Sequence, residues 1–210
     1  MIKIGIDFSL VSPAVCIYKD GEYSFISFFD DHGKKWETSK SKDFNYHRLL
    51  KNVIELNPYT RNINKSDYRE EQKTKMQSAK MIANKIANRL KEIVGDEDVV
   101  IGIEGFSYGS ISSSTLDLAL YNSFLRIKLL EVFGEDCLVI ISPTEGKKTL
   151  FGKGNAKKED MIQAFIENKT KDIELEKCSF WKFCNEQDID YKYIKPIDDL
   201  VDSYGILKSI

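Results

Sequence analysis

Two acidic side chains lie in apolar, strand-like segments, where burying a charged group is energetically unfavourable. Asp7 follows the alternating segment IKIGI, and Glu104 lies within VVIGIEGF at 99–106. Burying a lone carboxylate costs several kcal/mol unless it is paired or bound to a metal. If the two strands are neighbours in a sheet, both carboxylates emerge at the same edge, where they could act together.

The segment KPIDDLVDSYGI at 195–206 contains three further acids, Asp198, Asp199 and Asp202. Its pattern predicts a helix that begins near residue 197. A proline followed by acids suits a helix start, because the dipole there favours negative charge. This explains Asp198 and Asp199, and a solvated acidic surface remains an alternative. Asp202 lies one turn further on, beside Asp199, and two adjacent carboxylates repel unless a cation lies between them. A helix starting above the strand edge would supply these acids as further ligands.

Other metal ligands are scarce in this chain. The histidines, His32 and His47, lie in a polar region, and four cysteines are scattered without the close spacing of a zinc or redox motif. We expect reduced thiols and no histidine-based catalysis. Carboxylates alone would hold a hard cation such as Mg²⁺ or Mn²⁺.

A basic segment lies on a nearly neutral protein of net charge −2. The residues GKKTLFGKGNAKK at 146–158 carry lysines and no acid: Lys147, Lys148, Lys153, Lys157 and Lys158. A solvated lysine-rich loop would explain the segment alone. Beside a set of acids, the segment favours contact with a nucleic-acid backbone, which lysines attract electrostatically.

The remaining pattern predicts an α/β domain. Strands are expected at 2–8, 13–19, 22–29, 99–106 and 137–143, the first three forming a meander with a hairpin at Asp20-Gly21. Helices are expected at 76–93, 115–133, 157–168 and from about 197. A polar excursion with some helix occupies 30–75, and the aromatic stretch at 180–183 is expected to pack in the core. These elements imply a mixed sheet flanked by helices.

Bulk properties indicate an intracellular globular protein. The 210 residues are 42% hydrophobic and 30% charged, which suits one domain covering 1–210. No apolar run approaches the roughly 20 residues of a membrane span, and the first residues read as a strand rather than a signal peptide. We therefore expect a cytoplasmic protein without membrane contact.

The chain resembles the RuvC-like Holliday-junction resolvases of the ribonuclease H-like superfamily. The motifs that carry the resemblance are GIDFS at the first strand, IEGF at the fourth, DDLVDSYGI at the last helix and the basic GKKTLFGKGNAKKEDM. In the basic motif the matching positions are Lys147, Thr149, Gly152, Gly154 and Lys158. The likeness covers about 1–30, 76–168 and the last fifteen residues, so that 30–75 and 169–195 look like insertions.

The resemblance implies a fold, a substrate and a site. It implies a mixed five-stranded sheet, with a three-strand antiparallel meander and two parallel strands, and a homodimer that cuts branched DNA symmetrically with two Mg²⁺ or Mn²⁺ ions per site. The implied catalytic residues are Asp7, Glu104, Asp199, Asp202 and Lys158, with Asp198 replacing or assisting Asp199 as a metal ligand. The implied DNA contacts are Lys147, Lys148, Thr149, Lys153, Lys157 and Lys158, with Phe106 or Tyr108 near the junction centre.

The chemistry agrees with that implication. Two divalent ions roughly 3.5–4 Å apart activate a water and stabilise the leaving oxygen in phosphodiester hydrolysis. We expect Asp7, the central acid, to bridge them.

Three alternatives are kept. Actin-like and sugar-kinase ATPases open similarly but need a glycine-rich turn, whereas Phe8 and Ser9 follow Asp7 here. A non-catalytic DNA-binding protein is disfavoured by the complete acid set. A flap or fork nuclease of the same fold is the nearest alternative to a junction resolvase, because acids and lysines report the chemistry and not the branch geometry.

Overall fold

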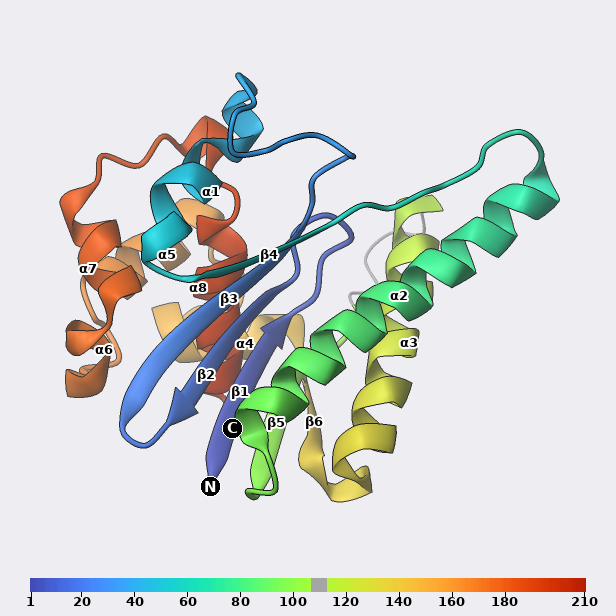
Figure 1. Ribbon diagram of the computed structural model, residues 1–210. Helices are drawn as coiled ribbons and strands as arrows, with labels where there is room; N and C mark the ends of the chain where they lie inside the picture. Colours follow the sequence, from blue (N-terminus) through green and yellow to red (C-terminus); the bar gives the residue numbers. More distant parts are fainter. Residues whose placement is uncertain (107–112) are drawn as a thin grey trace.

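The strands form one mixed sheet at the centre of the molecule. The computed structural model describes residues 1–106 and 113–210, and within them a six-stranded sheet has the order β4-β3-β2-β1-β5-β6 (Figure 1). The strands are β1 Ile2–Asp7, β2 Ala14–Lys19, β3 Glu22–Asp30, β4 Glu55–Tyr59, β5 Val99–Glu104 and β6 Leu138–Ile141. β1, β2 and β3 are antiparallel neighbours, whereas β1–β5, β5–β6 and β3–β4 are parallel pairs. The predicted meander and the two parallel strands are confirmed.

The sixth strand was not predicted. We expected five strands, and β4 comes from the excursion at 30–75, which has little apolar periodicity. β4 includes Pro58, which has no backbone N–H to donate, and it lies at the edge of the sheet against β3 alone. Proline is tolerated on edge strands because one side of the strand needs no partner. A polar edge strand of this kind lacks the alternation of apolar and polar residues by which strands are predicted from sequence.

The helices include the four predicted ones and a short one within the excursion at 30–75, and three others were not predicted. In chain order the helices are α1 Asn45–Leu49, α2 Tyr68–Val94, α3 Ser113–Phe133, α4 Pro143–Phe151, α5 Lys158–Ile166, α6 Ile173–Lys177, α7 Ser179–Glu186 and α8 Ile197–Leu207, with short 3-10 turns at Lys42–Phe44, Leu50–Asn52, Glu135–Cys137 and Tyr191–Tyr193. α2 begins earlier than its apolar pattern, because the Asp67 side chain accepts hydrogen bonds from the first backbone N–H groups of the helix. α4 lies within the basic segment, where we expected no helix.

Two hydrophobic cores cover the two faces of the sheet. α2 and α3 lie on one face, and α8 with its neighbours α4 and α5 lies on the other (Figure 1). The first core includes Ile4 and Ile6 of β1, and the second includes Val201 and Tyr204 of α8. Phe180 is fully buried in the second core, as predicted for the aromatic stretch. Among the described helices, none combines the length and apolarity needed to cross a lipid bilayer.

Candidate active site at the carboxyl end of the sheet

Strand alternation directs two acids toward α8. Gly5 and Asp7 share one face of β1, and Gly102 and Glu104 share one face of the parallel neighbour β5, where Gly5 is in register with Gly102. A Cβ atom on Gly5 would lie 2.2 Å from the backbone oxygen of Ser203 in α8, so this is the face that α8 covers. Asp7 and Glu104 therefore leave adjacent strands at one edge, on the side of the last helix.

A second pair of glycines brings α4 against α8. A Cβ atom on Gly205 would lie 3.1 Å from the carbonyl oxygen of Gly146. This contact places the next residue, Lys147, beside the acids, and a small cavity is lined by Lys147, Glu104 and Asp202. A lysine of the basic segment thus reaches the strand edge.

The acids of the strands and of α8 act on one another electrostatically. Burial raises the pKa of Asp7 well above its ordinary value. Its neighbours raise that pKa further, in decreasing order Asp199, Asp202 and Glu104. Burial also raises the pKa of Glu104, against the opposing effects of Lys147 and of a hydrogen bond with the side chain of Asp7. These residues, distant in the chain, meet at one place.

The aspartates of α8 differ in the direction of their pKa shifts. Burial and then the neighbouring carboxylates raise the pKa of Asp202 to about 7. Burial raises the pKa of Asp199 to about 6, although Lys195 lowers it. Burial would also raise the pKa of Asp198, but Lys195 and Lys158 lower it below its ordinary value. Neighbouring carboxylates raise one another's pKa values because each negative charge disfavours ionisation of the next.

Two lysines lie among the acids of α8. Lys158 donates to Oδ2 of Asp198, and Lys195 donates to Oδ1 of Asp199. The Lys195 ammonium also lies 3.1 Å from Oδ2 of Asp198. Burial would lower the pKa of Lys195, but Asp199 and Asp198 raise it. Lys195 was missed as a site residue, although its spacing of three and four residues from Asp198 and Asp199 was visible in the sequence.

The donor chemistry fits a divalent cation, but the side chains form no coordination site as they stand. Oδ1 of Asp198 and Oδ2 of Asp199 are buried and have no hydrogen-bond partner in the described part of the chain. Carboxylate oxygens are the donors that Mg²⁺ prefers. In residues 1–106 and 113–210, however, no three acidic, histidine or cysteine side chains are arranged to hold a metal ion. Metal binding by Asp7, Glu104, Asp198, Asp199 and Asp202 therefore stays a prediction.

The other predicted DNA-binding residues of the basic segment lie on α4 and between α4 and α5. Lys148, Thr149, Lys153 and Lys157 are exposed. Thr149 accepts a hydrogen bond from Ser209, so its hydroxyl already has a contact near the end of the chain. The lysines are exposed to solvent, and their contact with a DNA backbone stays a prediction.

The two aromatic candidates have different outcomes. The Arg126 guanidinium lies 4.4 Å from the ring centroid of Phe106, and Arg126 also donates to the carbonyl oxygen of Glu104. Phe106 is therefore next to the acid cluster, with one face of its ring covered. Tyr108 lies outside the described residues.

Solved structures with a similar fold were found. The yeast mitochondrial Holliday junction resolvase Ydc2 matches with a TM-score of 0.51 and 17% identity, over 99% of this chain and 76% of that chain. Thermus thermophilus RuvC, and the same protein in complex with a Holliday junction substrate, match with TM-scores of 0.48 at 10% and 12% identity, over 100% of this chain and 92% of theirs. No family model and no curated protein sequence matches the chain. The chain thus has the ribonuclease H-like fold of Ydc2.

Proposed function

We propose that this protein is a divalent-metal-dependent endonuclease that resolves four-way DNA junctions by paired phosphodiester hydrolysis. The observation that carries the proposal is the meeting of Asp7, Glu104 and the acids of α8 at the carboxyl end of adjacent parallel strands. The similarity to Ydc2 supports a nuclease of this fold. Its proposed location is the cytoplasm.

The acids would hold the metal. Asp7, Glu104, Asp199 and Asp202 are the proposed ligands, and Asp198 assists through its free oxygen. When bound, divalent ions make a water nucleophilic and stabilise the leaving oxygen of the phosphodiester. Metal binding then offsets the electrostatic cost of crowding these four acids, of which two are buried and two are partly buried.

The lysines would bind the phosphates of the DNA backbone. Lys158 has 58% of its side chain exposed although it pairs with Asp198, so its ammonium can also face a DNA backbone. Lys147 borders the cavity between Glu104 and Asp202. We propose that both contact the phosphates around the scissile bond, while the exposed lysines of the same segment attract the flanking backbone.

Paired cutting requires two active sites. A homodimer would place one site on each of two opposed strands of a four-way junction, and we propose that assembly. Branch geometry distinguishes this function from flap or fork cleavage, since the chemistry at each phosphate is the same.

The test compares branched substrates with and without metal. Purified protein is incubated with four-way, flap and linear duplex DNA in Mg²⁺, in Mn²⁺ and in EDTA. We expect paired symmetric cuts in the four-way junction with either metal and none in EDTA. Asp7→Asn and Glu104→Gln should lower the cleavage rate by at least about 10³-fold, since loss of a metal ligand removes several kcal/mol of transition-state stabilisation. Both variants should still bind the junction.

The matched control is Asp96→Asn. Asp96 is fully exposed and precedes β5, at the opposite end of the strand from Glu104. This variant should cleave at the wild-type rate. Full activity of Asp7→Asn or Glu104→Gln would remove the acid cluster from the mechanism, and preferential cutting of the flap would replace the resolvase assignment by a flap nuclease.

A further inference from the structure

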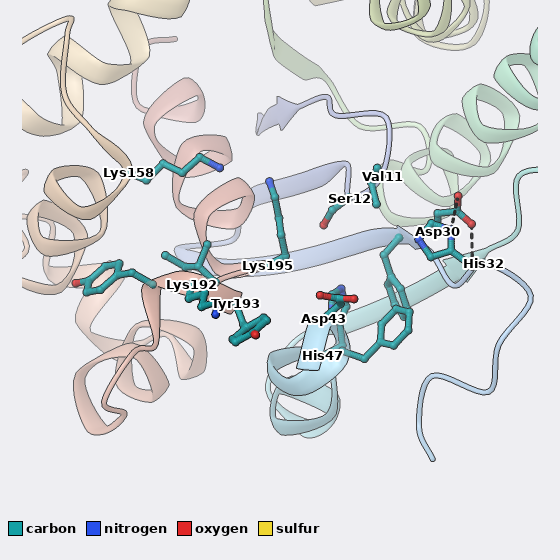
Figure 2. A pocket seen from close by; sticks show the side chains of 14 residues that line it. Val11, Ser12, Asp30, His32, Asp43, His47, Lys158, Lys192, Tyr193 and Lys195 are labelled. Carbon is teal, nitrogen blue, oxygen red and sulfur yellow. Dashed lines mark hydrogen bonds and ion pairs between the residues drawn. The ribbon is translucent and has the colours of Figure 1, made fainter. Parts of the chain in front are cut away.

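A pocket of about 460 Å³ is lined in part by Lys158 and Lys195, the two lysines that pair with Asp198 and Asp199. Figure 2 shows both lysines among the side chains that line it. Its walls come largely from the two segments outside the shared motifs, with Asp43 and His47 from 30–75 and Tyr193 from 169–195. The volume lies within the usual range for small-ligand pockets. The two apparent insertions therefore form most of a pocket next to the proposed active site.

The pocket contains buried polar groups that lack partners. His47 is 3% exposed and lies against the ring of Phe29, with 4.2 Å between ring centroids. Neither ring nitrogen makes a hydrogen bond of ordinary geometry within the described residues, although the backbone of Asp43 lies close enough to act on the ring as a weak hydrogen-bond partner. Ser12 is 2% exposed, and its hydroxyl is likewise unpartnered there. An unsatisfied buried polar group is costly, so two of them lining one pocket indicate a ligand that supplies hydrogen bonds.

His47 offers both kinds of hydrogen bond at neutral pH. Burial lowers the pKa of His47 to about 4, and the backbone of Asp43 opposes this only in part. The neutral imidazole has one N–H donor and one acceptor nitrogen. The edge of a nucleobase presents the same combination of donors and acceptors.

Tyr193 and Lys192 also line the pocket, and Lys42 lies against the ring of Tyr193 outside the lining. Tyr193 is partly exposed, and the ammonium groups of Lys42 and Lys192 lie 5.2 and 5.3 Å from its ring centroid. Bases stack on exposed aromatic rings, and nearby lysines attract the phosphate that accompanies each base. In Figure 2, Tyr193 and His47 come to the pocket from different segments of the chain. The lining thus suits a nucleotide better than an apolar ligand.

The pocket is continuous with the acid cluster through two shared lysines. Lys158 and Lys195 both line the pocket, and they pair with Asp198 and Asp199. A DNA strand whose phosphate lies at the acids therefore has its adjoining nucleotide near the pocket. We propose that this pocket receives one unpaired nucleotide of the cleaved strand, next to the scissile phosphate. The inference rests on the proposed nuclease function and adds a determinant of substrate choice.

This arrangement selects DNA with an unpaired nucleotide beside the cut. Extruding a base costs a few kcal/mol from an intact duplex and less where the base is already unpaired. Bases at a branch point are more easily unpaired than bases within an arm. The pocket therefore favours cutting at the branch.

The first test measures junction binding in EDTA, where no cleavage occurs. Tyr193→Ala should weaken affinity about tenfold, as expected for loss of one base–aromatic stack, whereas Tyr193→Phe should retain wild-type affinity. Tyr68→Ala is the matched control, because Tyr68 is 77% exposed at the start of α2 and does not line the pocket. Equal affinity of Tyr193→Ala and wild type would overturn the proposal.

The second test locates the nucleotide. Junctions carry 5-iodouracil at each position around the cut, and crosslinked peptides are identified by mass spectrometry. We expect one flanking position to crosslink to the 191–195 segment, and crosslinks confined to other segments would overturn the assignment. Ser12→Ala should weaken binding without lowering the thermal midpoint, because it removes a hydroxyl that is unsatisfied in the free protein.

Failure of the nuclease function and failure of the pocket assignment give different results. Wild-type protein that binds and crosslinks as expected but cuts no branched DNA with metal would refute the nuclease function and leave the pocket intact. Free deoxynucleoside monophosphates are titrated as a separate arm. Saturable binding of the free nucleotide, with no effect of Tyr193→Ala on junction affinity, would assign the pocket to a free nucleotide and overturn its DNA role.

Discussion

The two faces of the central strands have opposite characters. Ile4 and Ile6 of β1 lie in the core formed with α2 and α3, together with their partners on β5. The alternate residues, Gly5 and Asp7, face α8. One face is filled by large apolar side chains, whereas the other has a glycine, where a helix backbone comes close, followed by an acid. The same strands thus supply stability on one side and the proposed chemistry on the other.

The comparison shows how close packing positions a polar site. α8 lies near enough to β1 that Gly5 has no space for a side chain. This proximity carries Asp199 and Asp202 over the strand edge, where they raise the pKa of Asp7. We expect the apolar face to tolerate small changes in volume better than the glycine face, where the close approach of α8 sets the distance between the acids.

Gly5→Val should have the largest effect on stability. The first added carbon already meets the Ser203 oxygen at 2.2 Å and the Leu207 nitrogen at 2.5 Å, so α8 must move away. We expect a loss of about 3 kcal/mol or more in the free energy of unfolding, or failure to fold. On the opposite face, Ile4→Val should cost only about 1 kcal/mol. Urea denaturation measures both variants, and equal losses would mean that the two faces are equally tolerant.

The sequence predicted the elements with strong periodicity. The meander, the two parallel strands and the long helices follow from their apolar patterns, and the register then brings Asp7 and Glu104 to one edge. α4 was missed although Ser142 and Glu145 form a capping box with Pro143 at the first helical position. The capping box and the proline are both visible in the sequence.

Other features depend on tertiary contacts. The sequence shows Gly5 and Gly102 two residues before their acids, but not that α8 needs that space. The pairing of Lys195 with Asp199 depends on the orientation of the chain entering α8. The pocket requires segments separated by more than a hundred residues to meet, and neither segment has a pattern that specifies the other. Metal binding itself stays a prediction.

Asp202→Asn tests the crowding of acids on the α8 side of the sheet through the pH dependence of stability. The pKa of Asp202 is raised to about 7 in the fold, so its protonated form stabilises the protein below pH 4 and that contribution is lost as pH rises through 7. The variant should therefore gain stability relative to wild type across this range, on the order of 2 kcal/mol in metal-free buffer after allowance for partial solvent screening. Urea midpoints from pH 4 to 8 measure the difference.

Metal should reduce that difference. Excess Mg²⁺ should stabilise the wild type more than Asp202→Asn, because the amide is a poorer ligand than the carboxylate. Asp96→Asn, at the opposite end of β5, should follow the wild type at every pH. A constant offset between Asp202→Asn and wild type from pH 4 to 8 would contradict the proposed crowding of acids.

The smallest expected effect concerns single lysines on the two sides of the sheet. Lys148 is exposed on α4, on the side of the acids, whereas Lys80 is exposed on α2, which covers the opposite face. If the backbone of junction DNA lies along the basic segment, Lys148→Ala should lower the slope of log affinity against log salt by about 1, because one fewer counterion is released. Lys80→Ala should leave the slope unchanged. Equal slopes for both variants would place the DNA elsewhere, because a phosphate contact contributes to the salt dependence only where the lysine lies close to the backbone.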